Sequence, residues 1–430
     1  MKTLPFDGVR VADLSMMWAG PYATKLLAEL GAEVLKIESP SAWDNIRTLI
    51  PFPDRAEPWN SSYYFNTYNR GKKSVTLDLA QAKGRAVFLE LLAHCDVLIE
   101  NYRADVLDKL QLPYDVLREA NPQLVIVSMA GFGKTGADRS LVGFGPVIEM
   151  MSGLTSLTGY VDDEVPYKCG VSYGDPVAGV AAASAVAMGL LQRRRSGKAP
   201  IIDLAQREVA ATFAGGAFVA AQRDPAVRHH GNRHPQRLIA PRGAYRCRDE
   251  VRHRPTGAYA LIAARDADEQ WIAISALDDA QWAALAGLIG REELAGLSLA
   301  ERAARHDELD DAIAAWAATQ EAGEAVGALQ DAGVAAARVL DMVAIHDDPQ
   351  LRARRFWRDL PHPDMPVGWL QPGASWRFVE ADTSPTLRAP LFGEHTREVL
   401  SGLLGYDEAA LAELEAAHII ADAPINPGVG

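Results

Sequence analysis

The sequence predicts an α/β fold, with a large domain built on a Rossmann-like parallel sheet and a smaller α+β domain. Strand-like and helix-like segments alternate along residues 9–129, as in βαβ units. Between residues 223 and 257 the composition changes, because Arg, His and Pro accumulate there. The 430 residues also exceed what one hydrophobic core normally holds, so two domains are expected.

The elements of the large domain follow from local composition. Short runs rich in Val, Ile and Leu are predicted to be strands: residues 9–15, 32–38, 74–79, 96–101 and 124–129. Helix-like runs lie between them: residues 20–31, 82–95 and 114–120. The segment between the second and third strands is interpreted as a polar insertion. Short connections in this order favour a parallel sheet.

The predicted domain boundaries are set by the changes in composition. Residues 1–222 form the first part of the large domain, and 223–243 a linker. The small domain, 244–332, contains strand-like residues 244–246, 259–264 and 271–275, followed by alanine-rich helices. Residues 333–430 form a second linker and a helical C-terminal tail that returns to the large domain.

Composition and charge restrict the partners. Hydrophobic residues make up 48% and charged residues 23%, which is typical of a globular protein. The formal charge of −13 repels nucleic acid and anionic membranes, and the apolar run 177–191 is too short to span a bilayer. The three cysteines lack C-x-x-C spacing, so neither a zinc site nor a disulfide framework is indicated, and a cytoplasmic location is expected.

The glycine-rich stretch AGFGKTG, residues 130–136, follows a predicted strand and resembles a phosphate-binding loop. A P-loop requires glycine where this chain has Ser128, so that motif fails. A dinucleotide-binding turn requires a helix at the third glycine, and the residues after Gly136 lack helical periodicity. The stretch is therefore interpreted as a turn, and a nucleotide-dependent oxidoreductase remains only as an alternative.

The stretch GVSYGDPVAG, residues 170–179, precedes a strong helix-forming run. Asp175 before Pro176 is typical of a helix N-cap, which is one interpretation of this aspartate. The other interpretation is functional. A helix N-terminus favours an ionised carboxylate, so Asp175 would be an available nucleophile at neutral pH.

Several motifs in order give the chain a full-length resemblance to the CaiB/BaiF family, the class III (family III) coenzyme A transferases. They are residues 7–38, NRGKKSVTLDL (69–79), ENYRADVLDKLQL (100–112), SMAGFGKTG (128–136), GDPVAG (174–179), RRRSGKAPIIDLAQ (193–206) and APLFGEHTREVLSGLLGY (389–406). The resemblance implies transfer of CoA from an acyl-CoA to a small carboxylic acid, without a permanently bound cofactor or metal. It also implies an interlocked homodimer of ring-like chains.

The resemblance assigns roles residue by residue. Asp175 matches the nucleophile that forms a mixed anhydride and then an aspartyl-CoA thioester. The matching CoA-binding positions are Met17, Trp18, Leu77, Asn101, Tyr102 and Lys109. Met16 belongs to the same turn as Met17. Further cations that could meet phosphates are Arg47, Lys72, Lys73 and the Arg- and His-rich segment 223–254, for which solvated charge is the alternative.

Departures from the family pattern leave other functions open. Racemases of 2-methylacyl-CoA esters place a His-Asp pair where this chain has Phe144 and Gly145, and Glu149 nearby is interpreted as an ordinary helix residue. A non-catalytic CoA-binding homologue, or a chain that requires a paralogous subunit, is a further alternative. The segment 231–243 lacks the oligoglycine run that shields the intermediate in some members. The sequence does not identify the acyl group that CoA leaves or the carboxylic acid that accepts CoA.

Overall fold

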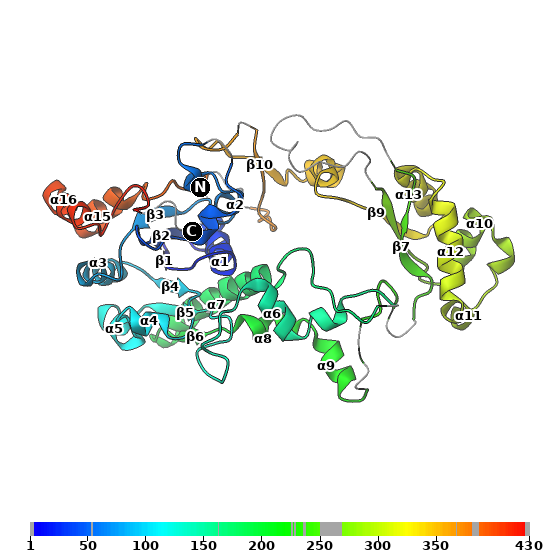
Figure 1. The fold of residues 1–430 in the computed structure, drawn as a ribbon, viewed down its shortest axis with the longest axis horizontal. Helices are drawn as coiled ribbons and strands as arrows, with labels where there is room; N and C mark the ends of the chain where they lie inside the picture. Colours follow the sequence, from blue (N-terminus) through cyan, green and yellow to red (C-terminus); the bar gives the residue numbers. More distant parts are fainter. Residues whose placement is uncertain are drawn as a thin grey trace. The chain divides into compact units, whose positions relative to one another are not determined.

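The computed structural model describes residues 4–52, 55–161, 163–224, 227, 229–234, 238–249, 269–366, 368–380 and 387–425. The chain divides into two compact units. The first comprises Met1–Thr155, Lys168–Pro225 and Arg354–Gly430, and the second comprises Ser156–Tyr167 and Ala226–Ala353. Figure 1 labels most of the helices and strands of each unit.

The first unit is built on a six-stranded parallel sheet of order β3-β2-β1-β4-β5-β6. Its strands are β1 (Arg10–Asp13), β2 (Glu33–Glu38), β3 (Lys73–Thr76), β4 (Val97–Glu100), β5 (Val125–Ser128) and β6 (Ile201–Asp203). This is the doubly wound order, which reverses between β1 and β4. The predicted Rossmann-like parallel sheet is confirmed, and β6 is a strand that the sequence reading did not include.

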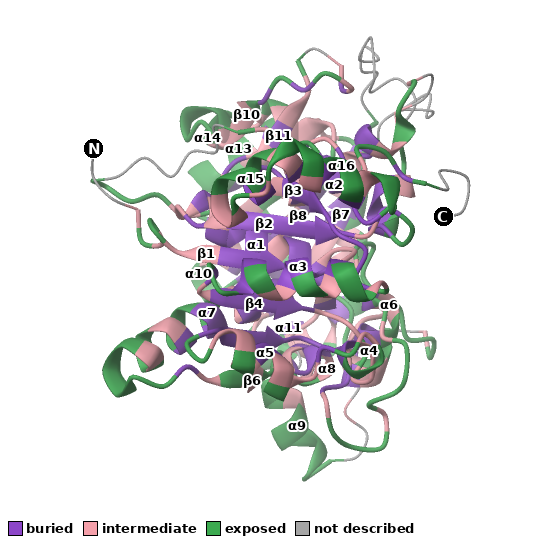
Figure 2. Ribbon diagram, turned by 90° about the vertical axis from the view of Figure 1, so that its left-hand side faces the viewer, coloured by how far each residue is buried: buried purple, intermediate pink, exposed green. Residues whose placement is uncertain are grey.

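Helices cover both faces of the sheet because adjacent strand residues point to opposite sides. Val11 joins the core under α1 (Ala19–Glu29) and α7 (Gly174–Ser196), whereas Ala12 joins the core under α3 (Ala82–Leu92) and α5 (Tyr114–Ala120). Strands β1, β2 and β4 are almost wholly buried (Figure 2). Such burial on both faces matches the apolar run Val97–Ile99 of β4, whereas β1 and β2 also bury charged residues, Asp13 and Lys36, in ion pairs.

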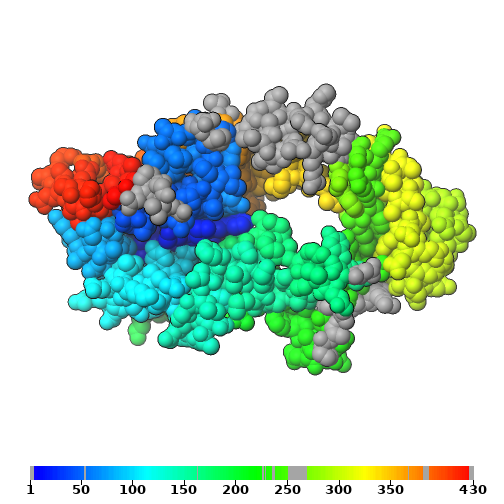
Figure 3. Space-filling view, in the orientation of Figure 1, coloured from blue at the N-terminus to red at the C-terminus, as the bar shows by residue number. Residues whose placement is uncertain are grey.

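The C-terminal tail completes the α3 side of this sheet. Helices α15 (Thr396–Leu404) and α16 (Glu408–Ala416) contribute Val399, Leu400, Leu411 and Leu414 to the core that contains Phe88. In the space-filling view the tail, in red, lies against the blue segments around β3 and α3 (Figure 3). The Thr396 hydroxyl also accepts a hydrogen bond from the amide of Thr76 at 2.9 Å.

Shorter elements complete the first unit. They are the helices α2 (Tyr63–Tyr68), α4 (Val106–Lys109), α6 (Gly145–Ser152), α8 (Gln206–Thr212) and α9 (Gly215–Ala221), the 3-10 turns Asn45–Thr48 and Pro58–Asn60, and the antiparallel pair β10 (Trp357–Asp359) and β11 (Leu370–Pro372). The 3-10 turn Thr155–Leu157 spans the point in the chain where the first unit ends and the second begins. Helix α2 lies within the predicted polar insertion. Ser62 caps it by accepting a hydrogen bond from the amide of Phe65.

Helix α7 is longer than the apolar run in the sequence suggested, with 23 residues. By length and composition alone it would be long and apolar enough to cross a membrane. Its alanine stripe is instead buried under the sheet, where Ala178, Ala182 and Val186 are inaccessible to solvent. Small side chains permit this close approach: a methyl group added at Gly189 would lie 2.7 Å from Val125.

The second unit contains a three-stranded antiparallel sheet of order β7-β8-β9. Its elements are β7 (Arg242–Arg246), β8 (Trp271–Ser275), β9 (Ala335–Val339), α10 (Asp279–Leu288), α11 (Leu299–Ala304), α12 (His306–Ala317), α13 (Ala322–Asp331), α14 (Pro349–Ala353) and the 3-10 turns Glu292–Leu294 and Ala344–Asp347. Buried Trp282 lies in its core, which contains both strand and helix residues.

These units differ from the predicted boundaries at both ends of the small domain. That domain was predicted to end at residue 332, but β9 pairs with β8 and the unit continues to Ala353. Most of the predicted 223–243 linker, from Ala226, and the separate segment Ser156–Tyr167 also belong to the second unit. The strand predicted at 259–264 lies outside the described residues.

Candidate active site

The carboxyl ends of β1 and β4 meet where the strand order reverses, which is the usual ligand-binding position in such sheets. Asn101, just after β4, holds the turn that follows β1. Its Oδ1 accepts a hydrogen bond from the Met16 amide at 2.8 Å, and its Nδ2 donates to the Met16 carbonyl at 2.7 Å. The next residue, Met17, has a left-handed φ of 65°. Such a conformation in methionine is strained by about 1–2 kcal/mol, so the surrounding contacts hold this turn.

Buried charges lie beneath this turn. Oδ1 of Asp44 accepts a hydrogen bond from the Met17 amide at 2.8 Å, and its Oδ2 lies 2.8 Å from Nζ of Lys36. Asp13, at the end of β1, lies 3.0 Å from Nζ of Lys72. Burial raises the pKa of Asp13, but the opposing charges of Lys72 and Lys36, together with hydrogen bonds, lower it overall. The turn therefore rests on paired ionic groups.

The cations proposed as further phosphate ligands are engaged in such pairs. Arg47 is fully buried against Glu38, with nitrogen and oxygen 2.8 Å apart. Lys72 is buried, and burial lowers its pKa to about 8. Both side chains are therefore buried in ion pairs and are not exposed on the surface as phosphate ligands would be. Lys73 is half-buried and pairs with Glu33 and with a glutamate of α15.

Asp175 lies at the second position of α7, facing helix α6. The two glycines of its motif permit the packing: a methyl group at Gly174 would lie 3.2 Å from Ile148 of α6, and one at Gly179 would lie 2.7 Å from a carbonyl of α1. Gly145 touches the carboxylate itself, since an added methyl group would lie 1.9 Å from Oδ2 of Asp175. A residue with a side chain at position 145, as in the racemase pattern, does not fit this arrangement.

The N-cap role and the favoured ionisation expected for Asp175 were both wrong. Helix α7 starts at Gly174 with Tyr173 at its N-cap, and no side chain caps it, so Asp175 is not the cap. The pKa of Asp175 is raised to about 7 rather than lowered, because burial and the nearby charge of Glu149 disfavour the ionised form. These effects exceed the modest stabilisation from a helix N-terminus.

The carboxylate of Asp175 receives no hydrogen bond from the described residues. Burial and the Glu149 charge account for its shifted pKa, without a hydrogen-bond contribution. An ionised carboxylate held in a partly buried place without donors is poorly solvated and correspondingly reactive.

An aromatic cluster from α1, α2 and the turn after β1 adjoins this carboxylate. Trp18 stacks on Tyr68 with ring centroids 5.2 Å apart, and Tyr22 meets Tyr68 edge-on at 6.0 Å. Tyr64 also contacts Trp18 at 6.0 Å. The pKa of Tyr68 is raised by burial, by the two neighbouring phenols and by the charge of Asp175, so Tyr68 lies within electrostatic range of the predicted nucleophile.

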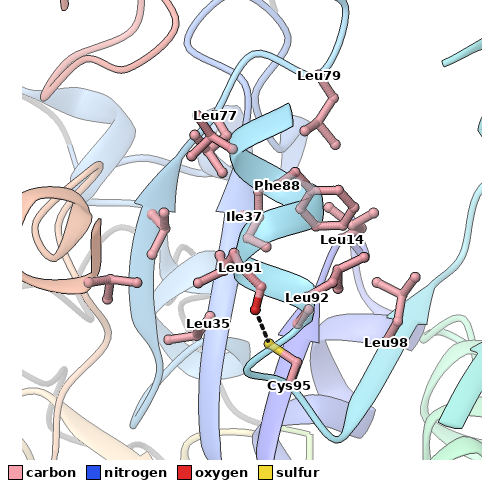
Figure 4. Close-up of a cluster of buried hydrophobic side chains, with 14 of the residues drawn as sticks. Leu14, Leu35, Ile37, Leu77, Leu79, Phe88, Leu91, Leu92, Cys95 and Leu98 are labelled. Carbon is pink, nitrogen blue, oxygen red and sulfur yellow. Dashed lines mark hydrogen bonds between the residues drawn. The ribbon is translucent and has the colours of Figure 1, made fainter. Parts of the chain in front are cut away.

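The other predicted ligand positions differ in what they offer. Met17, Trp18, Asn101 and Tyr102 lie together at the carboxyl edge of the sheet, in the segments after β1 and β4. The side chain of Leu77 is fully buried in the hydrophobic core (Figure 4), so only its backbone is available. The side chain of Tyr102 packs against the same core.

Lys109 stands apart from this group on the surface of α4. Its side chain is 66% exposed, and Nζ lies 2.5 Å from the carboxylate of Asp105. Because the pair is solvent-exposed, a phosphate could compete with Asp105 for the ammonium group. The position thus retains a cation that an anionic ligand can reach.

The AGFGKTG stretch is a turn, as predicted. Gly133 and Gly136 have left-handed φ values of 79° and 87°, and no helix begins between Gly136 and the start of α6 at Gly145. The Lys134 amide donates to Asp203 at 3.1 Å, and its Nζ lies 3.0 Å from Glu100. These contacts connect the turn to β6 and β4.

Charged residues of the Arg- and His-rich segment lie partly outside the described residues, which omit 225–226, 228, 235–237 and 250–268. Among those described, Arg233 forms ion pairs with Asp307 and Asp310 within the second unit. Arg246 pairs with Asp249 at 3.0 Å. In the described part of the chain no group of three or more His, Cys, Asp and Glu residues is arranged to hold a metal ion.

Two residues of the site were not identified from the sequence. Glu149 was interpreted as an ordinary helix residue, yet it is only 2% exposed and acts on Asp175. The sequence pattern that could have identified Glu149 is its i, i+4 spacing from Gly145, which places both residues on one face of α6. Tyr68 lay in the presumed polar insertion, where YYFNTY was too short for helical periodicity to be recognised.

Comparison with known proteins gives matches along almost the whole chain. A family model described as CoA-transferase family III matches residues 6–254 and 251–396. The succinyl-CoA–D-citramalate CoA-transferase of Chloroflexus aurantiacus is 32% identical over 421 residues, which cover 97% of this chain and 98% of the relative. The succinyl-CoA:mesaconate CoA-transferase of Haloarcula hispanica is 30% identical over 401 residues, with 92% and 95% coverage.

A solved structure gives the same result for the fold. A CaiB/BaiF family protein from Brucella suis superposes with a TM-score of 0.80 and 29% sequence identity. The match covers 94% of this chain and 100% of that chain.

Proposed function

The chain belongs to CoA-transferase family III and is a CoA-transferase, and we propose that it transfers coenzyme A between two carboxylic acids with Asp175 as the nucleophile. The observation that carries the proposal is the carboxylate of Asp175. It is partly buried, receives no hydrogen bond from the described residues and lies beside the aromatic cluster next to the β1 turn.

The reaction requires no net proton transfer. An oxygen of ionised Asp175 attacks the thioester carbonyl; the C–S bond breaks, CoA leaves as a thiolate, and a mixed anhydride remains. The thiolate then attacks the aspartyl carbonyl and releases the donor acid as a carboxylate, which leaves an aspartyl-CoA thioester. The acceptor carboxylate reverses these steps, forming its own CoA thioester and regenerating Asp175. A carboxylate suits this role because its anhydride retains the energy of the thioester.

We propose succinyl-CoA as the donor and a small dicarboxylate as the acceptor. The support is the naming of relatives, which include succinyl-CoA transferases for D-citramalate, mesaconate and glutarate. These acids share two carboxylates on a short carbon chain. A panel of such acids with succinyl-CoA and acetyl-CoA donors, read by mass spectrometry, tests the assignment.

CoA is proposed to bind over the turn after β1 and the segment after β4. Met17 and Trp18 would contact the acyl and pantetheine parts, and Asn101 and Tyr102 would lie beside the nucleotide part. Lys109 would pair with phosphate in place of Asp105. Leu77 would contribute through its backbone alone, since its side chain belongs to the core.

A homodimer and a cytoplasmic location complete the proposal. Apolar side chains of the first unit are exposed on α6 and α7, among them Met150 at 57%, Met188 at 63% and Leu191 at 47%. Exposure of this kind is typical of a protein interface, and family resemblance suggests an interlocked dimer. Light scattering after gel filtration tests the oligomeric state. Cys95, Cys169 and Cys247 are free thiols, as is usual in a reducing compartment.

The test of the mechanism is a covalent adduct. Incubation with acyl-CoA should add the mass of CoA, less water, to the peptide that contains Asp175, and hydroxylamine should remove it. Asp175→Ala should bind CoA but lose transfer and the adduct. Turnover in that variant would refute the mechanism, and deuterium exchange at the substrate α-carbon without an adduct would indicate a racemase instead.

A further inference from the structure

Glu149 is a buried carboxylate whose position toward Asp175 is fixed by helix α6. It lies one turn after Gly145, the residue that touches Oδ2 of Asp175, so both face the start of α7. Its Oε1 accepts a hydrogen bond from the amide of Tyr173, two residues before Asp175. Its Oε2 is buried and has no hydrogen-bond partner among the described residues.

A half-satisfied buried carboxylate is costly, since an unpaired buried charge destabilises the folded chain. Nothing in the fold requires an acid here, because an amide oxygen would serve the Tyr173 bond equally well. The cost is therefore a reason to look for a role in the reaction.

We propose, on the basis of the transfer reaction through Asp175, that Glu149 is a positioning residue whose negative charge favours the covalent intermediates over the free carboxylate. The two like charges face each other only while Asp175 is ionised. In the mixed anhydride and in the aspartyl-CoA thioester, Asp175 carries no charge, so the repulsion is absent in both.

The charge balance of each step supports this role. When Asp175 attacks the thioester, its negative charge passes to the CoA sulfur as the C–S bond breaks. When the thiolate attacks the aspartyl carbonyl, the charge passes to the departing acid. The first step thus moves charge off Asp175 and away from Glu149, the second leaves Asp175 uncharged, and regeneration of Asp175 brings the charge back. Relief of repulsion lowers the energy of the acylated enzyme relative to the free enzyme.

The other titratable groups around Asp175 do not duplicate this effect. Tyr68 of α2 lies beside Asp175 as a neutral phenol, since its pKa is raised. Tyr22 of α1 and Glu208 of α8 border α7, but neither contributes to the pKa shift of Asp175. Glu149 is the charged group that acts on Asp175 within the described part of the chain.

The matched variants are Glu149→Gln, which keeps an oxygen for the Tyr173 amide, and Glu149→Asp, which keeps the charge. Glu208→Gln removes an exposed carboxylate from α8 and serves as a control. Two quantities are measured: the pH dependence of kcat/KM, and the ratio of aspartyl-CoA enzyme to free enzyme by intact mass at fixed concentrations of acyl-CoA and free acid.

The wild-type enzyme should lose activity below a pH of about 7, where Asp175 becomes protonated. In Glu149→Gln the pH at which kcat/KM falls on the acidic side should be about one unit lower. The ratio of aspartyl-CoA enzyme to free enzyme should fall about tenfold. In Glu149→Asp and Glu208→Gln, kcat/KM should fall at the same acidic pH as in the wild-type enzyme. If Glu149→Gln is insoluble, Glu149→Ala replaces it with the same expected shift, because water can then bind the Tyr173 amide.

The outcomes separate this inference from the proposed function. The role of Glu149 would be overturned if Glu149→Gln showed the wild-type pH profile of kcat/KM and the wild-type ratio of aspartyl-CoA enzyme to free enzyme. The mechanism would remain intact in that case, provided that the wild-type enzyme forms the Asp175 adduct. Equal shifts of the pH profile in Glu149→Gln and Glu149→Asp would mean that Glu149 has a purely structural role. That result would also overturn the proposed effect of its charge. Absence of any Asp175 adduct in the wild-type enzyme would overturn the mechanism and this inference with it.

Discussion

Replacement of Asp175 by Asn should stabilise the protein in a way that depends on pH. The pKa of Asp175 is about 7 in the folded chain, compared with an ordinary value of 3.8, because burial and the Glu149 charge disfavour ionisation. Asn has nearly the same shape and mimics the protonated acid. Its effect on stability therefore measures the free-energy cost of ionising this carboxyl in the folded state.

The sign follows from the direction of the shift. Below pH 4 the carboxyl is protonated in the folded and unfolded chains, so Asp and Asn should be equally stable. Between pH 4 and 7 the unfolded chain ionises while the folded chain holds its proton, and the free energy of unfolding falls by about 1.4 kcal/mol per pH unit. Above pH 7 both forms are ionised, and the loss stays at about 4 kcal/mol.

The assay is thermal unfolding of the wild type and Asp175→Asn from pH 5 to 8.5, followed by circular dichroism. The difference in apparent Tm should increase with pH by roughly 3 to 6 °C and level off above pH 7. Glu208→Gln, which removes an exposed acid on α8, should give a difference that does not change with pH. A flat difference for Asp175→Asn would refute the argument that this carboxyl is held in a poorly solvating site.

Two substitutions test the geometry around the site. Gly145→Ala places a methyl group 1.9 Å from Oδ2 of Asp175, so kcat should fall at least tenfold in steady-state assays, whereas Gly287→Ala on α10, where nothing lies within 4 Å, should leave activity unchanged. Asn101→Ala removes both hydrogen bonds to Met16, and the KM for acyl-CoA should increase by about tenfold, or roughly 1.4 kcal/mol. Wild-type kinetics in either site variant would contradict the corresponding contact.

The parallel sheet could be predicted from the sequence because its strands are buried on both faces. Residues such as Val97, Leu98 and Ile99 form an uninterrupted apolar run, which is characteristic of a central strand. Strand β6, Ile201–Asp203, lies at the sheet edge, is only three residues long and is half-exposed, so it lacks the longer apolar run that marks a buried strand. Similarly, β9 is alanine-rich and becomes a strand only through its pairing with β8.

The candidate site was predictable only where a motif marked it. Asp175 lies between two glycines that the packing requires, and this leaves a recognisable pattern. Glu149 has no such pattern, because its role depends on how α6 packs against α7. Lys36 and Arg47 resemble ordinary surface cations in the sequence, yet their partners Asp44 and Glu38 enclose them in the core. Tertiary contacts, which local composition does not encode, decide these cases.

The way the last helices close the first sheet has a consequence during protein synthesis. Thr76 and Thr396 are bonded across 320 residues, and Phe88 shares a core with Val399 and Leu400. At a ribosomal rate of about 5–20 residues per second, the α3 side of that sheet stays uncovered for roughly 16 to 64 s after β3 has emerged. The nascent chain therefore exposes this apolar face over that period, and ribosomes stalled before α15 should yield a protease-sensitive product.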